Sequence, residues 1–580
     1  MKKNNYILAA FSALVIMTSC DLDPGVELLT SLQEEDVATR YDYQMRRLTS
    51  LYLGLPSGYM EIDGAMLASA TDEAEHTIQN SNVQRFNQGS WNAVSNPDDA
   101  WSGLFNSVRN ANLFLRDIDK VDLDMYRLNP RTDMQLIYQE RIEEMERWKR
   151  EARFLRAFYY FELIKRYGGV PLFEDVFAPG DDYGGINRNT LKECIEYIVS
   201  ELDSVAPGLP VEYPAGDLGR ASRGAALALK AKVLLYAASD LWNDPSWAGG
   251  YAEPELISLP PGDRMARWEA AADAARDVID MGHHRLHPVY PALFLAPESF
   301  RNREHILVRR HGASNQFERM NYSVGFDFGN SGTTPSQNLV DAHQVVVDPV
   351  TAVDFDWNNT NHAANPYADS GPTARDPRLF HNIVVNNSVF RGRNMEIWEG
   401  GIDGPPTAQS TRTGYYLKKF VDPDLNLHLN TTSVKAWPLI RLADVFLMYA
   451  EALNEYSPGH ADIARYVNFV RQRMPSVRMP RIPDGLSQDE VREFIRRERR
   501  IELAFEGHRF WDVRRWMIAP ETLGAPLRGM EITRTSADPP AFDYSTRIVE
   551  ERVFEPRMYF YPIPQSELML MPEWMQNPMW

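Results

Sequence analysis

The chain has 580 residues, of which 44% are hydrophobic and 24% are charged, a composition that is ordinary for a globular protein. This balance excludes a wholly disordered, collagen-like or multi-span membrane protein. The formal net charge of −19 argues against nucleic acid as a partner, because phosphate binding needs a basic face.

The N-terminus has the pattern of a lipoprotein signal. Two lysines are followed by an apolar run over residues 6–17, which is too short to span a bilayer, and then by small residues and Cys20. A cysteine at this point resembles a bacterial lipobox, and the acidic stretch after it resembles the surface-export signal of Bacteroidetes lipoproteins. We predict a signal peptide over residues 1–19, lipid on Cys20 and a lipidated tether over residues 20–33. The alternative is a plain signal peptide with an incidental cysteine.

The next part of the chain, residues 34–282, is predicted to be an N-terminal helical region. Gly168 is expected to end the long third helix as a C-cap, and Cys194, which then has no disulfide partner, is expected to be buried. Apolar residues at three- and four-residue spacing predict helices over residues 34–53 and 98–118. Further helices are predicted over residues 133–167, 189–205, 222–240 and 267–281.

Residues 283–440 differ in character. Asn, Gly, Pro, Asp and Thr become dense, with short strand-like runs at residues 383–385 and 415–420, so we predict a loop-rich ligand-binding insertion. The C-terminal helical region and tail follow over residues 441–580, and the last sixty residues are expected to be irregular. The helices predicted in this region cover residues 441–456, 461–474 and 488–506.

The recurrence of paired helices predicts the fold class. Helical pairs of about 15 to 20 residues that repeat without a clean consensus suggest stacked helical hairpins. We therefore predict a mainly α protein, a tetratricopeptide-like helical superhelix that carries a long irregular insertion and minor β structure.

Several segments resemble one family. Arg153–Phe161 running into Tyr167–Leu172, Arg441–Ala452, Arg497–Asp512 and Tyr561–Pro564 occur in the order and spacing of the SusD/RagB family of Bacteroidetes outer-membrane lipoproteins. The resemblance covers essentially the whole mature chain. It implies a surface lipoprotein, on the extracellular side of the outer membrane, that binds oligosaccharides or polysaccharides and delivers them to a SusC-like TonB-dependent transporter.

Three alternatives to this glycan-binding role remain open. The first is a RagB-like peptide-binding lid of such a transporter, the second is a surface glycan hydrolase, and the third is a purely structural transporter subunit. The chain has no GxSxG, Walker A, GxGxxG or HExxH motif. His283, His284 and His287 precede a proline in an apparent loop. We therefore predict a binding protein without catalytic residues, cofactor or metal.

The charged residues of the matching segments are predicted to be structural. They lie on helices beside apolar stripes, where paired charges usually anchor helix packing. Gly507 is expected to be a helix C-cap. The charged residues are Arg441, Asp444, Glu451, Arg497, Glu498, Arg500, Glu502 and Glu506.

Tryptophans outside the predicted helices are the candidates for ligand contact. A sugar ring stacks its apolar face on an indole while polar groups bind its hydroxyls. Trp101 and Trp437 adjoin helices and are expected in the core. The predicted ligand-binding residues are Trp91, Trp357 and Trp398, which lie among Asn, Gly and Asp, together with Asp72, Glu73, Arg85 and Asn96.

Overall fold

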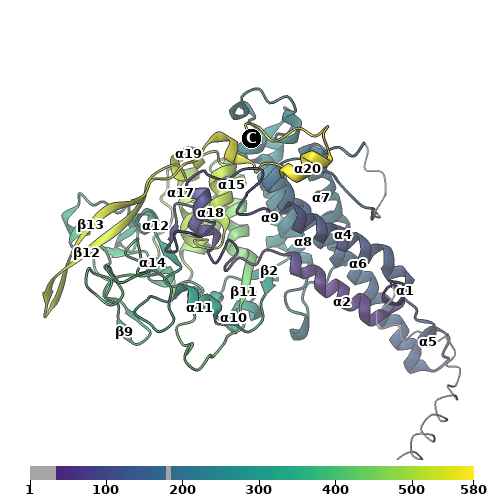
Figure 1. Ribbon diagram of the computed structural model, residues 1–580, viewed down its shortest axis with the longest axis horizontal. Helices are drawn as coiled ribbons and strands as arrows, with labels where there is room; N and C mark the ends of the chain where they lie inside the picture. The colour runs from purple at the N-terminus through teal and green to yellow at the C-terminus, as the bar shows by residue number, and fades with distance from the viewer. Residues whose placement is uncertain (1–33, 178–184) are drawn as a thin grey trace, which may run out of the picture.

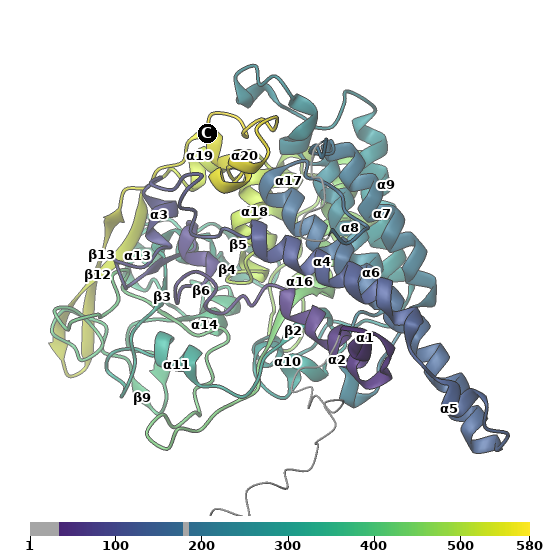
Figure 2. The same ribbon diagram turned by 45° about the vertical axis from the view of Figure 1, so that its right-hand side comes forward.

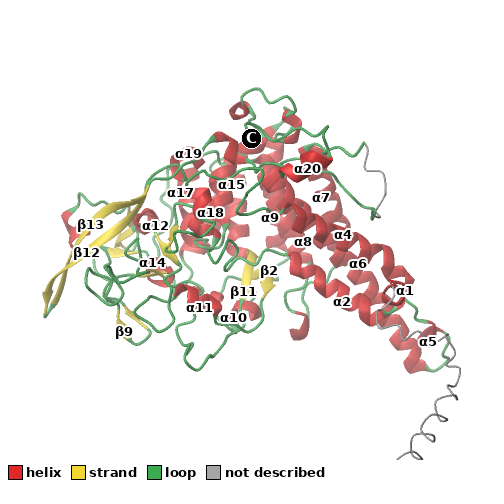
Figure 3. Ribbon diagram, in the orientation of Figure 1, coloured by secondary structure: helices red, strands yellow, loops and turns green. Residues whose placement is uncertain are grey.

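The computed structural model describes residues 34–177 and 185–580, so the predicted signal peptide, Cys20 and the tether lie outside the described residues. Two parts stand side by side (Figure 1). A stack of helices forms one end of the long axis, and a loop-rich part with short strands forms the other end. The secondary-structure colouring shows this division directly (Figure 3).

The helical part consists of antiparallel neighbours in chain order. α6 packs on α7, α7 on α8 and α8 on α9, and α15 from the C-terminal region packs on α8 and α9 to complete the stack. The predicted stack of helical hairpins is confirmed. Its N-terminal members are α1 (Glu34–Thr39), α2 (Tyr41–Leu51), α4 (Trp101–Asp117), α5 (Asp124–Arg127), α6 (Thr132–Tyr167), α7 (Leu191–Val205), α8 (Arg223–Ala238) and α9 (Arg264–Asp280).

The C-terminal region adds α15 (Leu442–Tyr456), α16 (Ala461–Arg471), α17 (Gln488–Glu502) and α18 (His508–Arg515). Gly168 ends α6 with a positive φ of 73°, as predicted. Gly507 differs from the expectation, because α17 already ends at Glu502. Gly507 is the N-cap of α18 and has a φ of 80°, a left-handed conformation that glycine adopts without steric cost.

The loop-rich part contains short antiparallel pairs. The predicted strands at 383–385 and 415–420 pair with each other as β7 (Ile383–Val384) and β10 (Tyr416–Leu417). Other pairs are β1 (Ala74–His76) with β3 (Thr333–Pro335), β4 (Val345–Asp348) with β5 (Thr351–Val353) and β6 (Ala374–Arg375), and β8 (Val389–Phe390) with β9 (Arg393–Asn394). Short helices between them are α10 (Glu298–Arg301), α11 (Gln316–Asn321), α12 (Gln337–Ala342), α13 (Thr360–Ala364) and α14 (Pro377–Asn382).

One strand pair closes the base of the loop-rich part. β2 (His305–Arg310) pairs antiparallel with β11 (Ala436–Arg441), and β11 leads directly into α15. The segment between these strands therefore leaves and re-enters the helical part at neighbouring positions. Three further short helices, α3 (Gln84–Asn87), α19 (Ala519–Thr522) and α20 (Gln565–Leu570), lie outside this segment.

The expectation of an irregular tail is wrong. β12 (Leu527–Ala537) and β13 (Pro540–Glu550) form a hairpin of 11 residues a strand, which lies along the outer side of the loop-rich part (Figures 1 and 3). The period-two pattern is interrupted because the register shifts inside the hairpin between Arg534 and Ser536, and because much of the hairpin surface is exposed Thr, Ser and Arg.

Each part has its own apolar core. Trp101 and Trp437 are 3% and 5% exposed, so their prediction as core residues is confirmed. Cys194 is fully buried in the helical core, as predicted. Burial raises the pKa of its thiol to about 12.

Candidate functional site

Asp72 and Glu73 are interior residues, although both are predicted to contact ligand. The Asp72 carboxylate accepts hydrogen bonds from Arg500 at 2.8 Å and from Arg509 at 2.9 Å. Burial alone would raise the pKa of Asp72, but these guanidinium groups hold it well below its usual range. Glu73 is 2% exposed and accepts a hydrogen bond from the Phe505 amide. Burial, with the nearby Asp72 charge, raises the pKa of Glu73 to about 7.

Trp91 corrects the expectation of an exposed indole. Its side chain is among the largest fully buried ones, with the whole residue 2% exposed, and the rings of Phe86, Tyr561 and Trp580 surround it with centroids 4.6 to 5.2 Å away. The polar sequence around Trp91 marks a loop that turns this indole inward. A buried ring presents no face to a sugar.

Arg85 and Asn96 are half-buried and bond within the loop that contains Trp91. The Arg85 guanidinium donates to the Ser95 hydroxyl, and the Asn96 side-chain carbonyl accepts from the Asp98 amide. Together with the burial of Asp72, Glu73 and Trp91, these contacts give the residues around Trp91 a packing role.

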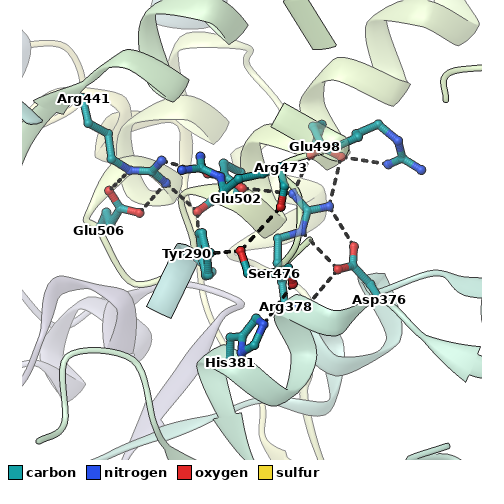
Figure 4. A network of polar contacts seen from close by, with 12 residues as sticks. Tyr290, Asp376, Arg378, His381, Arg441, Arg473, Ser476, Glu498, Glu502 and Glu506 are labelled. Atoms are coloured by element: carbon teal, nitrogen blue, oxygen red, sulfur yellow. Dashed lines mark hydrogen bonds and ion pairs between the residues drawn. The ribbon is translucent and has the colours of Figure 1, made fainter. Parts of the chain in front are cut away.

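A buried charge network joins the loop-rich part to the helices (Figure 4). Arg378 from α14 is fully buried and donates to Asp376 at 2.7 Å and to Glu502 of α17 at 3.1 Å. Arg441, at the end of β11, donates to Glu502 at 2.8 Å. The network comprises Glu304, Asp376, Arg378, Arg441, Arg471, Arg473, Glu498, Glu502 and Glu506.

Two carboxylates of this network have lowered pKa values because arginine or lysine lies beside them. Burial alone would raise the pKa of Glu506, but Arg441 and Lys419 lower it to about 2. Burial would also raise the pKa of Glu502, but Arg473 and Arg441 hold this pKa well below its usual range.

The other predicted structural charges are ion-paired as well. Arg499 and Arg515 join Asp444 and Glu451 in a second buried cluster, and the half-exposed Arg497 pairs with Asp354 at 2.7 Å. The contacts of these groups are thus with partners in the fold, which fits the prediction that the charged residues of the matching segments anchor packing.

Trp357 and Trp398 lie on the loop-rich part, where further aromatic side chains gather. Tyr544 contacts Tyr367 with ring centroids 5.2 Å apart, and Phe542 lies 6.3 Å from Tyr544 and 5.2 Å from Trp398. We call Trp357, Tyr367, Tyr544, Phe542 and Trp398 the aromatic band. Its members come from the insertion and from β13 of the long hairpin.

A chain of hydrogen bonds connects Trp357 to the rest of the band. The Trp357 indole N–H donates to Asp341 at 3.1 Å, and Asp341 also accepts from Gln337 at 2.7 Å. Gln337 in turn accepts from the Tyr415 hydroxyl, which lies 2.8 Å from that of Tyr367. These hydrogen bonds connect Trp357 to Tyr367 through Asp341, Gln337 and Tyr415.

The aromatic band differs along its length in what it offers to a ligand. Trp357, Tyr367, Tyr544 and Phe542 are half-buried residues, whereas Trp91 is fully buried. Trp398 is only 9% exposed, because Phe542 packs on it and the Arg534 guanidinium lies 5.0 Å from its ring. This burial corrects the expectation that Trp398 is an open platform.

Three members of the band are absent from the predicted residues. Phe542 and Tyr544 are two positions apart on β13, so their side chains lie on the same face of the strand. The sequence could have indicated this pair only if residues 540–550 had been predicted as a strand. Tyr367 sits in a loop far from β13 in sequence and has no comparable signal. Polar groups border the band, since Arg528 binds Asp341 at 2.9 Å and Asn386 lies 3.4 Å from the Tyr544 hydroxyl.

The larger pockets lie elsewhere and are lined mostly by charged and polar side chains. One of about 700 Å³ lies between α9, α15 and α17 and is bordered by Arg264, Glu455 and Arg492. Another, of about 630 Å³, runs beside α4 and is bordered by Glu61, Asp98 and Arg166. In the described ranges, no group of three or more His, Cys, Asp or Glu is placed to hold a metal.

Known proteins resemble this chain along most of its length. The profile of the SusD family matches residues 304–580, and a profile described as starch-binding associating with outer membrane matches residues 47–235. A SusD-like protein of Formosa agariphila is 24% identical, covering 72% of this chain and 70% of its own, and another from that organism is 23% identical over 91% and 95%.

Solved structures agree with these sequence matches. A SusD-like protein of Bacteroides fragilis is 25% identical, has a TM-score of 0.75 and covers 94% of this chain and 99% of its own. A SusD-like carbohydrate binding protein of the same species has a TM-score of 0.73 at 24% identity, covering 92% and 99%. Among the described residues, no helix combines the length and apolarity that crossing a bilayer requires. The chain belongs to the SusD/RagB family.

Proposed function

We propose that this protein binds oligosaccharides or polysaccharides at the aromatic band and passes them to a SusC-like TonB-dependent transporter. The observation that carries the proposal is the set of partly exposed rings, Trp357, Tyr367, Tyr544 and Phe542, on the loop-rich part. Asp341 and Arg528 border these rings and offer charged groups that can bind sugar hydroxyls. This role is a binding role without bond-making chemistry.

The proposal includes a location. Lipid on Cys20 would hold the protein on the outer membrane, facing the extracellular side, where the transporter and glycan are both accessible. Two or more acyl chains give stable anchoring. Metabolic labelling with a fatty acid tests this point, because label that persists after Cys20→Ser would contradict it.

Calorimetric titration tests ligand binding. The chain from Asp21 is titrated with neutral glycans, acidic glycans and peptides, and each mixture is analysed for new products. We expect one glycan to bind and Trp357→Ala to weaken it at least about tenfold, which is about 1.4 kcal/mol, as loss of a stacking ring requires. New reducing ends would indicate a hydrolase, and binding of peptides alone would indicate a RagB-like lid.

The matched control is Phe469→Ala. Phe469 is 44% exposed on α16, in the helical region and outside the band, so its loss should leave affinity unchanged. Equal weakening by Phe469→Ala and Trp357→Ala, or no weakening by Trp357→Ala and Tyr367→Ala, would move the site away from the aromatic band.

A further inference from the structure

The turn between α5 and α6 presents three apolar side chains to solvent. Met125, Leu128 and Leu136 are 71%, 67% and 60% exposed, and we call them the apolar tip. α5 and the first turns of α6 project beyond the rest of the helical part (Figures 1 and 2). A single exposed leucine needs no explanation, but three large apolar side chains grouped on one projecting end form a candidate interaction site.

The backbone that carries the apolar tip is well fixed. The Gln135 side-chain amide donates hydrogen bonds to three carbonyl oxygens of the turn, those of Tyr126, Arg127 and Asn129, at 3.1, 3.1 and 2.6 Å. The Arg141 guanidinium lies 4.2 Å from the Tyr126 ring centre. The backbone of the tip is therefore an ordered part of the helical region, held by these contacts.

The described chain begins beside this end of the molecule. The Asp122 amide, just before α5, donates to the Thr39 carbonyl of α1 at 2.8 Å. Glu34, the first residue of α1, lies only 14 positions after Cys20. A fully extended chain of that length spans at most about 50 Å, so an anchor on Cys20 keeps α1 within that distance of the lipid surface.

We propose that the apolar tip inserts into the lipid surface of the outer membrane beside the anchor. This inference rests on the proposed lipidation of Cys20. The charges around the tip suit such a position because they are paired, Arg127 with Asp124 at 2.7 Å and Arg131 with Asp133 at 2.6 Å. Paired charges can stay at the headgroup level while the apolar side chains reach the acyl boundary.

This contact would orient the protein. The apolar tip and the β12–β13 hairpin lie towards opposite ends of the longest axis (Figure 1). The acyl chains would hold the protein to the membrane, and the tip would limit its tilt.

Fluorescence quenching by lipid tests the inference. The lipidated chain is labelled at Leu128→Cys or at the control Leu429→Cys, whose position is 75% exposed in the loop-rich part. Cys194 is buried and does not compete for the label. In vesicles of phosphatidylethanolamine and phosphatidylglycerol that contain brominated lipid, we expect quenching at Leu128→Cys at least threefold above that at Leu429→Cys.

A second tether separates the two proposals. Failure of the lipidated chain to bind the vesicles would contradict lipidation of Cys20. The apolar tip is then tested with a second form of the protein that needs no lipid on Cys20. The chain from Asp21 with an N-terminal polyhistidine tag is bound to the same vesicles through nickel-chelating lipid, which replaces the anchor. Greater quenching at Leu128→Cys supports insertion of the tip, whereas equal quenching at both positions overturns it, as expected if the tip binds a protein partner instead.

Discussion

Replacement of Arg441 by methionine tests whether the buried charge network carries stability. Arg441 is fully buried, and its guanidinium donates to Glu304, Glu502 and Glu506, each at 2.8 Å. Methionine keeps the apolar part of the side chain but removes the positive charge that the three carboxylates face. Removing one partner of a buried ion pair costs about 3–5 kcal/mol, so we expect Arg441→Met to lower the free energy of unfolding by that amount.

Guanidinium chloride unfolding followed by tryptophan fluorescence measures this change. Arg131→Met is the matched control, because Arg131 pairs with Asp133 through a side chain that is 68% exposed, and its loss should change stability by less than about 0.5 kcal/mol. A loss below about 1 kcal/mol for Arg441→Met would refute the assignment of a large stabilising role to the network.

A double variant identifies the origin of the cost. Among the described residues, Lys419 is the ion-pair partner that Glu506 keeps once Arg441 is gone, and adding Glu506→Gln to Arg441→Met removes one of the three carboxylates that lost their arginine. We expect the double variant to be more stable than the sum of the single effects by at least about 1 kcal/mol. Strict additivity would show that lost packing, and not unpaired charge, sets the cost.

The remaining predictions concern one glycine, one cysteine and one histidine. Gly168→Ala should lower the free energy of unfolding by at least about 2 kcal/mol, because φ is 73° there and the new Cβ would lie 2.3 Å from the Leu256 carbonyl oxygen. The control is Gly485→Ala, where φ is 78° but no atom lies near the new Cβ. Equal losses in the two variants would show that the clash at Gly168 is unimportant. Cys194 should resist iodoacetamide at pH 8 until denaturant is added, because its buried thiol has a pKa of about 12; fast native labelling would contradict this. Burial lowers the pKa of His343 to about 4, so on acidification the unfolded chain takes up a proton at this histidine before the folded chain does. The free energy of unfolding should therefore fall as pH drops from about 6.5 towards 4. His343→Gln should flatten this part of the stability–pH profile, and an unchanged slope would exclude this histidine as a cause.

The helices were predictable to within a few residues because their signals are local. The apolar stripe of α4 and the glycine at the end of α6 are both readable in the sequence, and Gly168 does end the helix. The β12–β13 hairpin was missed because a register shift between Arg534 and Ser536 interrupts the pairing and polar residues cover its exposed surface.

The candidate site was predictable only in part because burial depends on long-range contacts. Trp91 and Trp357 both lie in polar sequence, yet the three rings around Trp91 come partly from the last twenty residues of the chain, whereas Trp357 stays at the surface. Tyr367 and Tyr544 meet although nearly 180 positions separate them, and no local pattern reports such a contact.

The strand pair at the base of the loop-rich part has a consequence for how the family can diversify. Because β2 and β11 hold Arg310 opposite Ala436, everything between them behaves as a cassette whose two ends are already joined. Doubling the length of such a segment adds only about 0.6 kcal/mol of closure entropy. Recognition loops can therefore be exchanged while the helical stack is retained, provided that each replacement supplies a partner strand for β1 and a counterpart of Arg378 for the carboxylates of α17.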